Sequence, residues 1–260
     1  MEKRDMRHIR VVVLGAGLTL ATGIAVAMAG TPFGGDDSGQ IPSSKSTLKC
    51  ENSIGNAVGK AVVCFLKCDA ARADGKLADD TAEDACEKNN AGKSCLEKFE
   101  ATATKKQSKD TTGGCNCVNV PSIALTIEAI MDGVAGISYC DSSSGTHFGG
   151  EDTGFLPPPK SAIKKCEDKA NKLVGKAVPC FLKCDAARAD GKLADDTAED
   201  ACEKNNAGKS CAEKLEASVA KLKGCPSCVS GSNLARFFEG ALDGINSEWY
   251  CASPSGAFLE

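Results

Sequence analysis

The chain has 260 residues and contains 16 cysteines, only 2 histidines and a formal net charge of -4 at pH 7. This length accommodates one or two domains, and the acidic balance gives no electrostatic basis for binding nucleic acid. The scarcity of histidine leaves few candidates for haem ligation, for a classical zinc site or for a histidine-based triad. The cysteines are therefore the main signal in the sequence.

The first 29 residues have the pattern of a secretory signal peptide. Residues 1–10 are net positive, Val11–Ala27 is apolar, and Ala27-Met28-Ala29 has the small-x-small form of a cleavage site. The apolar stretch is shorter than the roughly 20 residues that cross a bilayer. Export is therefore favoured over an uncleaved N-terminal anchor, and we predict a secreted or extracytoplasmic protein with no stable membrane span after cleavage.

The rest of the chain is an internal duplication. Cys68–Cys95 recurs without one change as Cys184–Cys211. The openings correspond as well, with GTPFGGDDSGQIP from Gly30 and GTHFGGEDTGFLP from Gly145. Such self-similarity predicts tandem repeats. The predicted units are a signal peptide over residues 1–29, a first repeat over 30–144 and a second repeat over 145–260.

Apolar residues within each repeat follow a helical period. In the first repeat, those of residues 50–68 step by three and four, which places them on one face of a helix. Asp74-Gly75 ends this helix, and a capping box then begins a second helix that we expect over Thr81–Ala103. A third helix is expected over Ser122–Ser138. The predicted fold is all-α, with two tandem disulfide-stapled three-helix units after a cleaved signal peptide.

Each repeat contains eight cysteines, and an even number in an exported chain indicates disulfides. Few aromatic residues and many alanines give a thin apolar core, so cross-links that restrict the unfolded chain add needed stability. The predicted structural disulfide cysteines are Cys50, Cys64, Cys68, Cys86, Cys95, Cys115, Cys117 and Cys140, followed by Cys166, Cys180, Cys184, Cys202, Cys211, Cys225, Cys228 and Cys251.

Helix geometry narrows the pairing. Cys68 and Cys86 lie equally far from the turn at Leu77, so antiparallel helices bring them opposite each other. The predicted pairs are therefore Cys68–Cys86 and Cys184–Cys202.

Three further pairings are expected in the first repeat. Cys50 is expected to pair with Cys115 or Cys117, and the other member of that close pair with Cys140. The remaining pair is Cys64 with Cys95. This disulfide requires the Asn-Asn-Ala-Gly segment to break the second helix.

Thiol-based metal binding is the alternative. Cys64-x-x-x-Cys68 and Cys180-x-x-x-Cys184 each place two sulfurs on one helical face, a geometry that suits Cu(I). Against it, Cys225-x-x-Cys228 corresponds to Cys115-x-Cys117, and a metal site is not expected to change its ligand spacing between copies. Redox exchange is a weaker alternative, because a C-x-x-C redox motif normally opens a helix in a βαβ unit.

Two other features are interpreted as structural. Asp36-Asp37 and Glu151-Asp152 offer oxygens for Ca²⁺, but solvated linker is the favoured interpretation. His147, the one histidine left after export, has Pro32 as its counterpart, which argues against a catalytic role. Common catalytic and phosphate-binding motifs are missing. We therefore predict a non-enzymatic protein with no catalytic residue, no cofactor and no metal ligand.

The combination of motifs resembles a family of exported, cysteine-rich helical tandem-repeat proteins in bacteria. The motifs are the FGG-acid-D-x-G opening, the Lys-Cys start of the first helix, the C-x-x-K-C segment ending at Cys68, the acid-x-A-C segment ending at Cys86 and the Gly-Cys close. This family has no assigned activity, so the resemblance implies architecture and export alone. The expected function is a secreted or surface-associated structural or interaction protein; the alternative is a copper-binding or storage protein.

Overall fold

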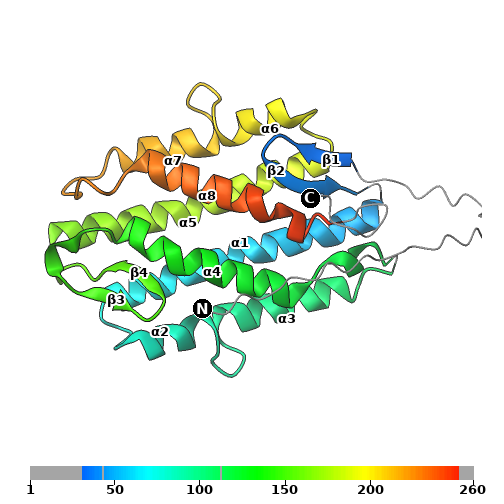
Figure 1. Cartoon of the computed structure of the whole chain (residues 1–260). Helices are drawn as coiled ribbons and strands as arrows, with labels where there is room; N and C mark the ends of the chain where they lie inside the picture. The colour runs from blue at the N-terminus through cyan, green and yellow to red at the C-terminus, as the bar shows by residue number, and fades with distance from the viewer. Residues whose placement is uncertain (1–30, 43, 112, 252–260) are drawn as a thin grey trace, which may run out of the picture.

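The computed structural model describes residues 31–42, 44–111 and 113–251 (Figure 1). The predicted signal peptide lies outside these residues, and its cleavage stays a prediction. The described part is mostly helical, as predicted, with eight α-helices and four short strands.

The helices follow the same order in the two halves of the chain. In the first half they are α1 (Lys45–Ala73), α2 (Asp80–Glu87), α3 (Cys95–Gln107) and α4 (Val120–Ser138). In the second half they are α5 (Ala162–Ala189), α6 (Asp196–Glu203), α7 (Cys211–Val219) and α8 (Gly231–Ile245). The strands are β1 (Thr31–Gly34), β2 (Asp37–Ile41), β3 (His147–Gly149) and β4 (Asp152–Phe155).

The prediction of one continuous second helix is wrong, because residues 81–103 form parts of two helices, α2 and α3. Helix α2 ends at Glu87, and in the connection to α3 Ala91 and Gly92 adopt left-handed backbone conformations, with φ of 47° and 82°, which a continuous helix cannot contain. Ser94 then begins α3 with a capping box, in which its hydroxyl accepts from the Glu97 amide and the Glu97 carboxylate accepts from the Ser94 amide. The predicted three helices per repeat therefore become four.

Two β-hairpins, which were not predicted, precede α1 and α5. Strands β1 and β2 pair antiparallel around the Gly34-Gly35 turn, and β3 and β4 pair in the same way around Gly149-Gly150. All four glycines have positive φ values, which a tight turn requires here. Such short, glycine-rich strands lack the alternating β-branched residues that indicate a strand in a sequence.

Each hairpin packs on helices of the other half of the chain. Strands β1 and β2 pack on α5 and α8, and strands β3 and β4 pack on α1 and α4. Arg188 in α5 donates to the Phe33 carbonyl oxygen of β1 at 3.1 Å, and Phe33 is buried against Tyr250 with a ring separation of 4.8 Å. Arg72 in α1 donates to the Phe148 carbonyl oxygen of β3, also at 3.1 Å. The N-terminal hairpin thereby closes on the last helices of the chain, as Figure 1 shows for β1, β2 and α8.

The two halves share one hydrophobic core, in which the long helices α1 and α5 lie against each other (Figure 1). Gly59 allows the close approach, because a Cβ there would meet Leu182 of α5 at 2.5 Å. Phe65 and Phe181 are fully buried in this core. The first helix of each repeat therefore packs against the first helix of the other repeat as well as against helices of its own. Much of the apolar surface is buried between the repeats.

All sixteen cysteines form disulfides, which fits an oxidising environment. The predicted pairs Cys68–Cys86 and Cys184–Cys202 are both present. Cys50 pairs with Cys115, which selects one of the two predicted partners.

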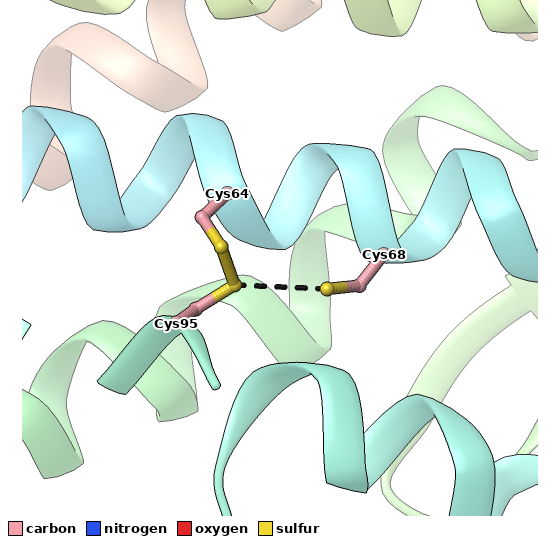
Figure 2. Close-up of side chains that lie close together, drawn as sticks. All are labelled: Cys64, Cys68 and Cys95. Atoms are coloured by element: carbon pink, nitrogen blue, oxygen red, sulfur yellow. Dashed lines mark hydrogen bonds between the residues drawn. A yellow bond between two sulfur atoms is a disulfide. The ribbon is translucent and has the colours of Figure 1, made fainter. Parts of the chain in front are cut away.

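The pair Cys64–Cys95 is confirmed as well, because the break between α2 and α3 moves Cys95 to the start of a new helix (Figure 2). The dashed line in Figure 2 joins the sulfurs of Cys95 and Cys68, which are 3.6 Å apart. Both sulfurs are oxidised and carry no proton, so this contact is packing between neighbouring disulfides.

The expected partner of Cys140 is wrong. Cys140 pairs with Cys228, and Cys117 with Cys251, so that two disulfides join the first half to the second. The prediction assumed that each repeat closes its own cross-links. Helix α4 packs against α8 and α5, however, and its end therefore lies next to the second half.

One described helix, α4, is long and apolar enough to cross a membrane by length and composition. Its apolar face, which includes Ile123, Ile127 and Val134, is buried in the shared core. A core helix passes the same test of composition as a membrane span.

We predict that the paired substitution of Cys117→Ser with Cys251→Ser lowers the free energy of unfolding by about 2–4 kcal/mol, because it releases a cross-link between residues 134 positions apart. Urea unfolding in buffer without added oxidant or reductant measures this loss of free energy, because the other disulfides stay intact. Cys140→Ser with Cys228→Ser is the matched second variant, and an unchanged midpoint in both would contradict the cross-linking of the two halves.

Candidate functional site

Two groups of buried carboxylates are the most unusual chemical feature of the described residues. The first carboxylate cluster consists of Asp69 from α1, Glu83 and Glu87 from α2, Asp132 from α4 and Asp152 from β4. The second carboxylate cluster consists of the corresponding Asp185 from α5, Glu199 and Glu203 from α6, Asp243 from α8 and Asp37 from β2. Each cluster thus collects acids from three helices and the hairpin that docks there.

The helical period places the acids of α1 and α2 toward each other. Asp69 follows Cys68, whose disulfide to Cys86 joins α1 to α2 beside the cluster. Glu83 and Glu87 are one turn apart on α2, so both side chains lie on the same face. Asp69, Glu83 and Glu87 are each no more than 1% exposed.

No N–H group and no hydroxyl group of a Ser, Thr or Tyr among the described residues donates to either carboxylate oxygen of Glu83 or Glu87. In the second cluster the same holds for both oxygens of Asp185, Glu199 and Asp243. A buried carboxylate that is neither paired nor hydrogen-bonded costs several kcal/mol. The repetition of this arrangement in both halves makes it a property of the fold.

The nearby basic residues contact the rim of each cluster more than its interior. Lys88 contacts Asp84 at 3.1 Å and Glu128 at 3.3 Å, and also pairs with Glu151 of the hairpin turn. Arg72 approaches Glu83 at 3.6 Å, beyond hydrogen-bond distance. Most of the inner acids therefore have no base in direct contact among the described residues.

The second cluster has the same rim. Lys204 contacts Asp36 at 2.5 Å and Glu239 at 2.8 Å, but its distance to Asp243 is 3.9 Å. Arg188 lies 3.9 Å from Glu199. The two halves thus match in their acids and also in the placement of the two bases.

Burial favours the protonated form of these acids. Burial, and then the negative charges of Asp152 and Asp69, raise the pKa of Glu83 to about 9. Burial is also the main cause that raises the pKa of Asp152 to about 7. The pKa values of Asp185 and Glu203 are raised for the same reason, and these two carboxyl groups lie close enough to share a proton.

The cluster geometry corrects the interpretation of the two acidic hairpin segments as solvated linker. Asp36 and Glu151 are exposed and pair with Lys204 and Lys88, but Asp37 and Asp152 belong to the clusters. The duplicated GG-acid-Asp pattern was the available signal. Sequence analysis missed the helical acids, because a charged residue on an amphipathic helix is normally solvated.

Thiolate ligands are not available in the described residues, since every cysteine is in a disulfide. The sulfurs of Cys64, Cys68 and Cys95 do gather closely, as Figure 2 shows, but as members of two neighbouring disulfides. A copper site at this position requires their reduction first. His147 is exposed on β3, where its ring lies 4.5 Å from that of Phe155.

No family model matches the chain, and neither the curated proteins nor the solved structures contain a match to it.

The raised pKa values predict that, in chelator-containing buffer, the protein loses stability as the pH rises from about 5 to 9. In this range the folded protein retains protons on acids such as Glu83 and Asp152 that the unfolded chain, with carboxyl pKa values of about 4, has released. Thermal unfolding across this pH range measures the effect. Glu83→Gln is expected to flatten the slope, and stability that increases toward pH 9 would contradict the burial of ionisable acids.

Proposed function

We propose that the protein is an exported, non-catalytic structural or interaction protein, built from two tandem disulfide-stapled helical units that are locked together. Export, cleavage of residues 1–29 and the repeat boundary at residues 144 and 145 belong to this proposal. The observation that carries it is the complete pairing of sixteen cysteines, including two cross-links between the halves.

The cross-links support a role that depends on a fixed shape in an oxidising compartment. Disulfides persist in such compartments and restrict the unfolded chain. Here three disulfides lie within each half. The remaining two join Cys117, just before α4, and Cys140, just after α4, to the second half. The packing of each hairpin on the other half's helices fixes the same arrangement without covalent bonds.

The placement of the reactive residue types supports a non-catalytic role. General acid–base catalysis requires a base within hydrogen-bond reach of its partner. His147 is exposed, and its ring lies against the apolar ring of Phe155. The cysteines are unavailable as nucleophiles while oxidised. We therefore expect the protein to bind another protein or a surface and not to convert a substrate.

Expression of the full chain in a bacterial host with an oxidising periplasm tests the proposal. We expect a mature N-terminus at Gly30 and almost no free thiol after denaturation, measured by N-terminal sequencing and a thiol reagent. Protein from a reducing cytoplasm is the matched control, in which thiols should be abundant. Many free thiols with co-purifying copper in the periplasmic protein would favour the thiol-based metal store instead, and a retained N-terminus would favour a membrane anchor.

A further inference from the structure

We propose that each carboxylate cluster is a binding site for a hard divalent cation, and that the cation is Ca²⁺. Folding assembles the first cluster from α1, α2, α4 and β4. It assembles the second cluster from α5, α6, α8 and β2. This inference goes beyond the proposed function and does not depend on export or on a protein partner.

The first argument is the set of oxygens that the protein itself leaves without a donor. Both carboxylate oxygens of Glu83 and Glu87 and one oxygen of Asp69 are buried and lack a hydrogen-bond donor among the described residues. Asp69 and Glu87 face each other, and the negative charges of Asp132 and Asp152 act on both. Among the described residues, Arg72, 3.6 Å from Glu83, is the one base paired with the three buried acids, and a divalent cation between their oxygens would coordinate all three directly.

The second argument is that the site is built twice, including where the two halves differ in sequence. Helices α4 and α8 share few residues, yet both place an acid pair four positions apart. Glu128 and Asp132 lie beside Lys88 at the first cluster, and Glu239 and Asp243 lie beside Lys204 at the second. Neighbouring apolar positions changed while these acids stayed, which is expected if their oxygens act together.

The third argument concerns the bases at the rim. Oxygens of Asp36, Glu239 and Asp243 lie within 4.8 Å of one another, but Lys204 already contacts the first two. The rim therefore has its own cation. The inner acids Asp185, Glu199 and Glu203 have no equivalent partner, since the nearest base, Arg188, is 3.9 Å from Glu199. The proposed ion belongs to the interior of the cluster.

The donor chemistry selects the ion. The ligands are carboxylate oxygens, which suit Ca²⁺, Mg²⁺ and Mn²⁺, whereas copper and zinc favour imidazole or thiolate. Ca²⁺ accepts six to eight oxygens in a flexible geometry, whereas Mg²⁺ requires a near-ideal octahedron and retains several waters. Ligands from four separate elements, with both oxygens of several acids available, fit the larger and more tolerant ion.

The hairpin acids give each site a mechanical consequence. Asp152 and Asp37 are contributed by the docked hairpins, so an ion bound to a cluster also ties that hairpin to the helices beneath it. In the second cluster this joins residue 37 to acids beyond residue 184. The ion would therefore add a non-covalent cross-link between the first and last segments of the described chain.

Isothermal titration of the oxidised full chain with CaCl₂, after removal of ions by a chelator, tests the proposal. We expect two Ca²⁺ per chain, dissociation constants below about 1 mM as in extracellular calcium modules, weaker binding of Mg²⁺, and a melting temperature that rises with Ca²⁺. Absence of heat and of any shift in melting temperature with either ion would overturn it. Mg²⁺ binding tighter than Ca²⁺ would overturn the assignment of the ion.

Single substitutions separate a cation site from a purely structural cluster. Glu87→Gln and Glu203→Gln are each expected to reduce the stoichiometry from two ions to one, and to lessen the rise in melting temperature that Ca²⁺ produces. Glu216→Gln, at an exposed acid of α7 outside both clusters, should leave both ions bound. Asp152→Asn and Asp37→Asn serve as the second pair of variants if either Gln variant fails to fold. Retention of two ions in the cluster variants would overturn the proposed location, whatever the outcome of the thiol measurements.

Discussion

The constraint on which this structure depends is the burial of acidic side chains, since seven of the ten acids in the two carboxylate clusters are buried. Unpaired carboxylates oppose folding, because they lose their hydration without gaining a partner. The disulfides act against this cost by restricting the unfolded chain. Cys68–Cys86 and Cys184–Cys202 in particular join the two helices that contribute the inner acids of each cluster. The cross-links and the acids are thus parts of one arrangement.

The helices and the short-range disulfides could be predicted from the sequence because both follow from local geometry. A stripe of apolar residues and a turn at Leu77 were enough to place Cys68 opposite Cys86. The pairing of Cys140 could not be predicted in this way, since it depends on how α4 packs against the second half. Identical sequence segments suggested two self-contained units, but the shared core between α1 and α5 is a tertiary property that no repeat contains by itself.

The carboxylate clusters were less visible in the sequence for a related reason. Asp69, Glu83 and Glu87 occur in a segment rich in lysine, aspartate and glutamate, where a solvated face is the ordinary interpretation. Their burial arises when the hairpin of the other repeat covers them. A hairpin of glycines and two acids gives little sign that it covers a helix, so the acids in its turn were interpreted as linker.

The exchanged hairpins also determine the order in which the chain can reach its final form. Strands β1 and β2 are synthesised before α5 and α8, on which they dock, and Cys117 cannot pair with Cys251 until that residue has been synthesised. Oxidation in order of emergence would join Cys117 to an earlier sulfur. Correct maturation therefore requires the nascent chain to keep some thiols reduced, or a disulfide isomerase to rearrange early mispairings.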